Sequence, residues 1–250
     1  MRKFFILLSI CYSLIGFSQT AEQKFESGNN FYKEAKYQEA INEYLSIDSL
    51  GVHSADLYYN LGNSYYKLNQ VAPTIYYFEK ALKLNANHAE AKANLVFANR
   101  MKLDVIEPLP ENAFVTMFKN INAKFSYNAW AWIAVVFAFL TAVLFFLYHF
   151  SFSSRQKIIY FNICILSFLM MNFAIASAYK SYGYNVETVH AIIFQQKVEV
   201  RNGPTLNSEN IFQIHEGTKV EILDTVDDWK KIKLADGKTG WMPDVSLKEI

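Results

Sequence analysis

The chain has few of the residues that build disulfide frameworks or metal centres. It contains two cysteines, Cys11 and Cys164, and both lie inside long apolar runs. Cysteines so placed exclude a disulfide framework and a CxxC metal motif. The five histidines are scattered, without the His-x-His or His-x3-His spacing that sets two ligands side by side. The sequence therefore predicts no metal site and no cofactor.

An excess of charge of either sign is also missing. Lys and Arg number 24 against 23 Asp and Glu, and the net charge is +1. No overall field attracts nucleic acid, and after Val186 acidic residues outnumber basic ones. No Ser/His/Asp set, carboxylate pair or glycine-rich phosphate loop stands in a suitable context. We therefore expect a protein that is not an enzyme and does not bind nucleic acid.

Hydrophobic residues make up 52% of the chain, but they are concentrated in three runs. The first run, Phe4–Phe17, follows Arg2 and Lys3 and ends in a small-residue pattern at Ser18. This order predicts a secretory signal peptide over residues 1–18 that is cleaved after export. The alternative is an uncleaved anchor. Both interpretations place the residues that follow outside the cytoplasm.

The other two runs, Tyr127–Phe150 and Ile158–Ala178, predict transmembrane helices. At about 1.5 Å per residue, each is long enough to cross a hydrocarbon core of about 30 Å. Neither contains Asp, Glu, Lys or Arg, which argues against a pump or transporter. Asn162 and Asn172 are polar exceptions, and bonds to another helix and local bonds both remain open.

The short segment between these runs indicates their orientation. Residues 151–157 carry Arg155 and Lys157 and no acidic residue. By the positive-inside rule this loop lies in the cytoplasm. Both terminal domains are then expected in the periplasm of a bacterium, anchored by two spans in the lipid bilayer of the inner membrane.

Near the N-terminus a sequence motif repeats. Gly28-Asn-Asn-Phe-Tyr-Lys33 recurs as Gly62-Asn-Ser-Tyr-Tyr-Lys67. This spacing matches the period of about 34 residues that is typical of tetratricopeptide helix pairs. In such pairs a small residue lets two helices approach, and large residues fill the gaps around it. Residues 19–103 therefore resemble a tetratricopeptide domain, closed by a capping helix at about 89–102.

The tetratricopeptide resemblance implies that function lies on the face made by the first helix of each pair. Asparagines there can bond a peptide backbone, and tyrosines supply rigid contact area. The alternative is that Asn29 and Asn63 only stabilise helix packing and that the lysines are solvated. The candidate peptide-binding residues are Phe25, Asn29, Tyr32, Lys33, Tyr59, Asn63, Tyr66, Lys67, Phe97 and Arg100.

A linker, residues 104–126, separates the repeats from the first span. Pro108 and Pro110 end the helical pattern. An amphipathic helix is predicted after them, lying on the membrane surface or docked against the repeats. Its apolar positions are Phe114, Met117, Phe118, Ile121 and Phe125.

The C-terminal region, residues 186–250, changes to short alternating runs broken by turn signals. Strands are predicted over 198–201, 218–223, 229–234 and 239–242. Val200-Arg-Asn-Gly-Pro204 and Asp236-Gly-Lys-Thr-Gly-Trp241 resemble segments of bacterial SH3 domains. Bacterial relatives of that fold bind peptides or peptidoglycan, which makes Trp229 and Trp241 candidate surface residues. Packing in the core or in turns is the alternative for both.

The order of these parts resembles the BatE-type family of the bacterial aerotolerance operon. The implied fold class is a multidomain membrane protein with all-α tetratricopeptide pairs, a two-helix transmembrane hairpin and a small all-β SH3-like barrel. The resemblance implies membrane partners with von Willebrand factor A domains, encoded near a MoxR-type ATPase. We expect a non-catalytic scaffold that binds partner proteins, and the alternative is a cell-wall sensor that binds peptidoglycan through the barrel.

Overall fold

The computed structural model describes residues 20–110, 112–183 and 188–250. The predicted signal peptide, residues 1–18, lies outside the described residues and stays a prediction. The chain forms two compact units: residues up to Leu109 together with Val189–Ile250, and Pro110–Thr188. The helical repeats and the C-terminal strands therefore belong to one unit, although the two long apolar helices separate them in sequence.

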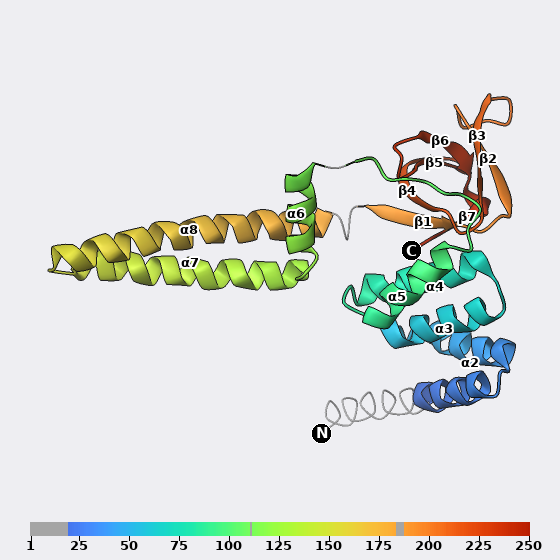
Figure 1. The fold of residues 1–250 in the computed structure, drawn as a ribbon, viewed down its shortest axis with the longest axis horizontal. Helices are drawn as coiled ribbons and strands as arrows, with labels where there is room; N and C mark the ends of the chain where they lie inside the picture. The colour runs from blue at the N-terminus through green and yellow to red at the C-terminus, as the bar shows by residue number, and fades with distance from the viewer. Residues whose placement is uncertain (1–19, 111, 184–187) are drawn as a thin grey trace, which may run out of the picture. The chain divides into compact units, whose positions relative to one another are not determined.

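The helices of the first unit stack as antiparallel pairs (Figure 1). Residues 20–33 pair with α2 (Tyr37–Ser49), and α3 (Ala55–Lys67) pairs with α4 (Val71–Leu84). The array continues with α5 (Ala89–Asn99), which ends slightly before the predicted capping helix does. Ser54 is the N-cap of α3, and its hydroxyl accepts a hydrogen bond from the Leu57 N–H.

Glycines explain how closely the paired helices approach. A Cβ atom at Gly28 would lie 2.5 Å from the Tyr44 ring, and one at Gly62 would lie 2.6 Å from the Phe78 ring. Both aromatic residues are buried, and their separation in sequence equals that of the two glycines. Thr74 on α4 is also buried, and its hydroxyl donates to the Gln70 carbonyl 2.6 Å away. The sequence period thus corresponds to a repeated packing contact.

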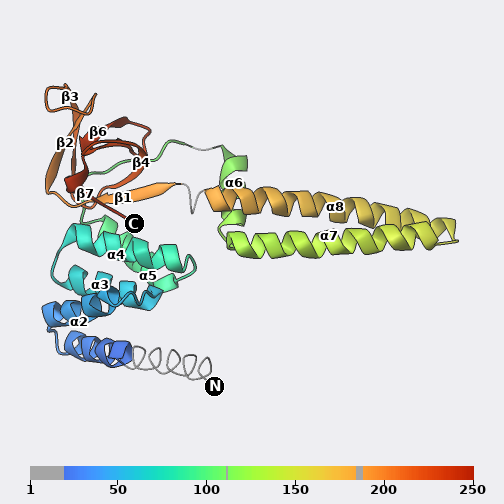
Figure 2. The same ribbon diagram turned by 180° about the vertical axis from the view of Figure 1, so that it is seen from behind.

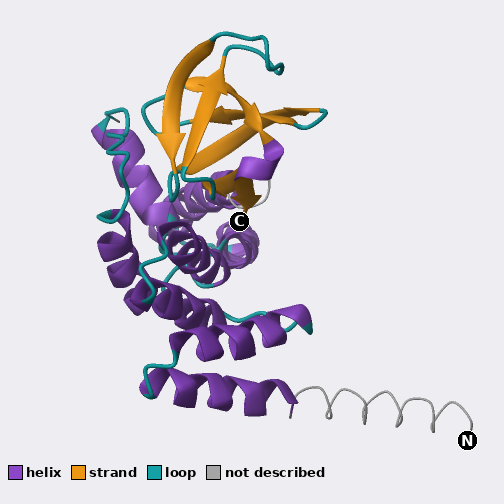
Figure 3. Ribbon diagram, turned by 90° about the vertical axis from the view of Figure 1, so that its right-hand side faces the viewer, coloured by secondary structure: helices purple, strands orange, loops and turns teal. Residues whose placement is uncertain are grey.

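The C-terminal strands curve into a small antiparallel barrel (Figure 3). The sheet order is β3-β2-β6-β5-β4-β1-β7. Its strands are β1 (Val189–Ile193), β2 (Lys197–Arg201), β3 (Asn210–His215), β4 (Lys219–Val226), β5 (Trp229–Lys233), β6 (Thr239–Pro243) and β7 (Leu247–Glu249), with a 3-10 turn at Asp244–Ser246.

Four strands were predicted near their observed positions, whereas β1, β3 and β7 were not predicted as strands. In β1 the consecutive residues Ala191, Ile192 and Ile193 are all buried, so the alternation that identifies a strand is lost. One face of β1 lines the barrel core, where Ala191 and Ile193 lie. Its other face packs on the helices, where Ile192 is buried among Ile75, Phe78 and Ala98.

The barrel therefore covers the last helices of the array, beside α4 in both ribbon views (Figures 1 and 2). Tyr76 meets Phe194 edge to face, with ring centroids 5.5 Å apart. Lys219 and Glu79 form an ion pair of 2.7 Å between the two parts. The sequence predicts separate modules, but the structure shows a packed interface between them.

The segment after α5 also belongs to the barrel. Asp104 accepts bonds from the His215 N–H at 2.6 Å and the Thr218 hydroxyl at 2.7 Å, and it contacts His215 Nδ1 at 2.8 Å. Ile106 packs against the barrel core, and the Leu109 N–H donates to the Ala235 carbonyl. The part of the predicted linker before Pro110 is thus an integral piece of the SH3-like domain.

The second unit consists of a helical hairpin and a short helix. The hairpin pairs α7 (Tyr127–Phe150) with α8 (Ser154–Tyr182), and both helices are long and apolar enough to cross a membrane by length and composition. α8 begins before the predicted span and continues past its end, so the connecting turn is shorter than expected. Thr141 donates to Ser167 across the hairpin at 2.8 Å, whereas Asn172 bonds locally to the Phe168 carbonyl.

The predicted amphipathic helix is α6 (Ala113–Asn122). Its contacts are with the hairpin: Phe118 meets Phe173 edge to face, and Ile121 packs against the Trp130 cluster. The sequence left membrane-surface and repeat docking open. The structure adds the hairpin as a packing partner that the sequence did not suggest.

Candidate functional site

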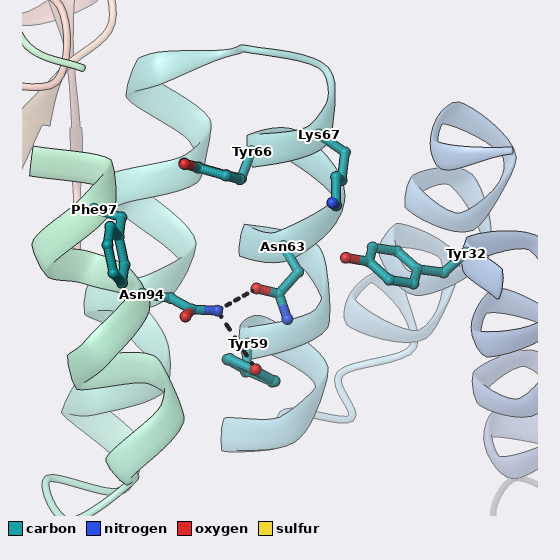
Figure 4. A pocket seen from close by; sticks show the side chains of 7 residues that line it. All are labelled: Tyr32, Tyr59, Asn63, Tyr66, Lys67, Asn94 and Phe97. Carbon is teal, nitrogen blue, oxygen red and sulfur yellow. Dashed lines mark hydrogen bonds between the residues drawn. The ribbon is translucent and has the colours of Figure 1, made fainter. Parts of the chain in front are cut away.

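A pocket lies on the face made by the first helices of the pairs, as expected for the predicted groove. Its volume is about 250 Å³. Figure 4 shows the side chains directed toward it from residues 20–33, α3 and α5. We call it the Asn63 pocket, and its lining residues are Tyr32, Tyr59, Asn63, Tyr66, Lys67, Asn94 and Phe97.

Six of the ten candidate residues line this pocket, and the other four lie elsewhere on the array. Phe25 packs beside Tyr44, with ring centroids 5.8 Å apart, and borders the helical core. Lys33 and Arg100 are exposed, and Arg100 lies 5.2 Å from the centre of the Phe97 ring. Asn94 was not a candidate, although it stands one repeat period after Asn60. That spacing was the signal that could have identified it.

Asparagines from neighbouring helices form a repeated hydrogen-bond pattern. The Asn60 amide donates to Asn29 Oδ1 at 3.0 Å, and the Asn94 amide donates to Asn63 Oδ1 at 2.8 Å. Asn29 Oδ1 also accepts from the Tyr44 hydroxyl at 2.8 Å. The bond that joins the first helices of two successive repeats therefore recurs one period later, so it is a property of the repeat.

These bonds fix which way the two candidate asparagines point. The oxygens of Asn29 and Asn63 accept hydrogen bonds from neighbouring helices. This agrees with the alternative that these side chains stabilise helix packing. Their amide nitrogens make no hydrogen bond to any described residue. In Figure 4 the Asn63 nitrogen is directed away from Asn94. Each side chain therefore serves packing with its oxygen and offers a donor with its nitrogen.

Two tyrosines at this face or packed against it have raised pKa values. Burial, followed by the neighbouring Tyr37 and Tyr59, raises the pKa of Tyr32. Burial, with a further contribution from Tyr32, raises the pKa of Tyr44 to about 12. Lys67 is the charged residue among the seven that line the pocket, and no carboxylate is among them. The site therefore presents amide and hydroxyl groups, one cation and no carboxylate.

The two barrel tryptophans lie outside the buried core. On β5 and β6 the core positions are Ile232 and Met242, both fully buried. Trp229 and Trp241 are in the opposite register and are half-buried on the outer face. Lys231 Nζ lies 5.9 Å from the centre of the Trp241 ring. The geometry thus leaves both rings accessible to a ligand.

Comparison with known proteins identifies the two domain types. The bacterial SH3 domain family matches residues 197–248, and the tetratricopeptide repeat family matches residues 55–88. Neither is a catalytic domain, and both domain types suggest a scaffold that binds protein partners. No match was found among curated proteins.

One solved structure with a similar part is the C-terminal SH3 domain of myosin IB from Entamoeba histolytica. It is 28% identical and covers 22% of this chain and 90% of its own, with a TM-score of 0.16.

Proposed function

We propose that this protein is a non-catalytic scaffold whose Asn63 pocket binds an extended segment of a partner protein. The observation that supports this most directly is the pair of amide nitrogens on Asn63, which lines the pocket, and on Asn29, which lies at the equivalent position one repeat earlier. Both are left without a partner among the described residues by the hydrogen bonds that fix their oxygens. A peptide carbonyl is the complementary acceptor, and donors at equivalent repeat positions suit a ligand that runs along several helices.

We further propose that α7 and α8 anchor the scaffold in the bacterial inner membrane. Their length and apolar surface support two spans, and Arg155 and Lys157 at the start of α8 support a cytoplasmic turn. The repeats and the barrel then lie in the periplasm after cleavage of the signal peptide. The resemblance to BatE-type proteins favours a stress-related membrane complex with von Willebrand factor A domain partners.

The test keeps the packing role of the asparagines and removes only the donor. In Asn29→Asp/Asn63→Asp each oxygen still accepts its helix bonds, while the amide nitrogen is lost. Tagged full-length protein is captured from gently solubilised membranes, and its stoichiometric partners are identified by mass spectrometry. We expect partners that copurify with the wild type to be lost from the double variant.

A matched control is Asn42→Asp. Asn42 is exposed on α2, and its oxygen also accepts an amide bond, from Gln38. It does not line the pocket, so this variant should retain every partner. Partners retained equally by the Asn29/Asn63 double variant would contradict the assignment of the pocket.

A second candidate function is peptidoglycan binding by the barrel, favoured by the half-buried outer positions of Trp229 and Trp241. The full chain is required for its test, because Ile106 and the helices complete the barrel's packing. Cosedimentation with purified sacculi should be lost in Trp229→Ala/Trp241→Ala if the cell wall is the ligand. Wild-type protein that stays in the supernatant would exclude this function.

A further inference from the structure

We infer that the ligand of the Asn63 pocket is an acidic peptide segment that carries an aromatic side chain. This inference rests on the proposed function, because it assumes that the pocket holds a segment of a partner. It adds the chemical class of that segment, which neither domain match specifies. Charge, hydrogen-bond donors and exposed apolar surface each point to the same class.

The first argument is charge. Lys33, Lys67 and Arg100 are exposed at the C-terminal ends of three successive first helices. They form no ion pair within the described parts of the chain. Several other lysines of this unit are paired, as in Lys24 with Glu43 and Lys219 with Glu79. A helix C-terminus contributes only about half a negative charge, so a net positive edge remains for a carboxylate.

Acidic residues occupy the opposite ends of the same helices. Asp56 in the first turn of α3 lies 3.3 Å from His88 Nε2, and Glu90 in the first turn of α5 lies 3.2 Å from His88 Nδ1. The face is therefore positive at one end and carries acids at the other. This polarity favours a ligand whose carboxylates lie beside Lys67 and repels them from the His88 end.

The second argument is the excess of donors in the pocket. In the pocket the Asn63 nitrogen and Lys67 donate, the tyrosine hydroxyls can donate or accept, and Asn94 Oδ1 accepts. The Asn29 nitrogen adds a further donor one repeat away. A ligand rich in acceptors, with backbone carbonyls and side-chain carboxylates, satisfies this set. A basic segment would leave the amide nitrogens facing further donors.

The third argument is exposed aromatic surface. Phe97 is 51% exposed and Tyr66 is 40% exposed, although both line a concave site. The volume of about 250 Å³ is below the range of about 300–1,000 Å³ typical of small-molecule pockets. It suits one large side chain of a peptide, and an aromatic ring gains most by packing against Phe97 and Tyr66.

The test is selection of random linear peptides, displayed on phage, by the full chain in lipid nanodiscs. We expect enriched sequences that combine Asp or Glu with an aromatic residue, relative to empty nanodiscs. The enriched peptide is then synthesised and its affinity is measured by fluorescence anisotropy. Affinity should fall about tenfold in Lys67→Glu, since attraction is replaced by repulsion, and should weaken as salt is added.

Lys197→Glu is the matched control, because Lys197 is exposed on β2 and does not line the pocket. It should change the affinity less than twofold. Enrichment of neutral or basic peptides whose binding is lost in Asn63→Asp would overturn the acidic class and leave the proposed function standing. No enrichment by the wild type would overturn both.

Discussion

The helical array has two surfaces, of which one is covered by the barrel and the other is open. The end formed by α4 and α5 is covered by the barrel, and Ile192 and Ile75 are almost completely buried there. The face formed by the first helices is left open, with Phe97 half-exposed. Both surfaces contain aromatic and charged side chains, so these residue types alone do not distinguish them.

The two surfaces differ in whether their polar groups have partners within the protein. At the covered end Asp104 receives three contacts from the barrel, Glu79 pairs with Lys219, and Lys83 bonds to the Ile250 carbonyl. On the open face two amide nitrogens and three cations have no hydrogen-bond or ion-pair partner among the described residues. A buried interface requires partners for its polar groups. Polar groups that remain unpaired on the open face are solvated and can exchange water for a ligand.

The largest loss of stability should come from Ile192→Asp, which disrupts the packing of the covered surface. This change puts a carboxylate where the wild-type side chain is fully buried among apolar residues. We expect a loss of about 4 kcal/mol or more in the free energy of unfolding, because the charge is left unpaired. Denaturant unfolding of the full chain in detergent measures it.

Val245→Asp provides the control for Ile192→Asp. Val245 is 83% exposed on the same barrel, so its substitution should change stability by less than about 0.5 kcal/mol. Equal stability of the two variants would show that the barrel does not depend on its contact with the helices.

A smaller effect is expected from Asp104→Asn. This variant weakens the bonds to His215 and Thr218 and should lower stability by about 2 kcal/mol at neutral pH. Burial alone would raise the pKa of Asp104, but bonds from His215 and Thr218 outweigh it and hold that pKa below its ordinary value of 3.8. The carboxylate's contribution is therefore present above pH 3.8 and is lost as pH falls through the depressed pKa.

Unfolding measured at several pH values tests this account of Asp104. The difference between wild type and Asp104→Asn should shrink in strong acid. Glu107→Gln, an exposed change in the same segment, should match the wild type throughout. A difference that persists unchanged at the lowest pH would assign the loss to packing.

The covered surface was also the harder one to predict. The repeat period identified the Gly28 and Gly62 packing positions because tetratricopeptide contacts recur at a fixed separation. No such rule connects Asp104 to His215, which are 111 residues apart and flank both apolar helices in sequence. The same limit applies to β1, whose two buried faces remove the alternation of a strand. On the open face Asn94 was missed only because its repeat equivalent, Asn60, was not a candidate either.

Changes at Asn63, which lies on the open face, should alter the free energy of unfolding only slightly. Asn63→Leu removes the acceptor of the Asn94 amide and should cost about 1 kcal/mol. Asn63→Asp keeps that acceptor and should stay within about 0.5 kcal/mol of the wild type. Chemical unfolding of both variants separates the packing role of the oxygen from the donor role of the nitrogen. Equal destabilisation by both changes would mean that the amide nitrogen is also needed for the fold.

The smallest effect on stability is expected from Phe97→Ala, although it removes a large side chain. Because half of the ring is already exposed, truncation should lower stability by no more than about 1 kcal/mol. Peptide affinity should nevertheless fall about five- to tenfold, since a ligand ring loses its apolar contact surface. Unfolding and anisotropy on the same preparation give both values. A variant that loses stability and retains affinity would contradict this prediction. Phe97 would then contribute to the fold, as the covered residues do, and not to ligand binding.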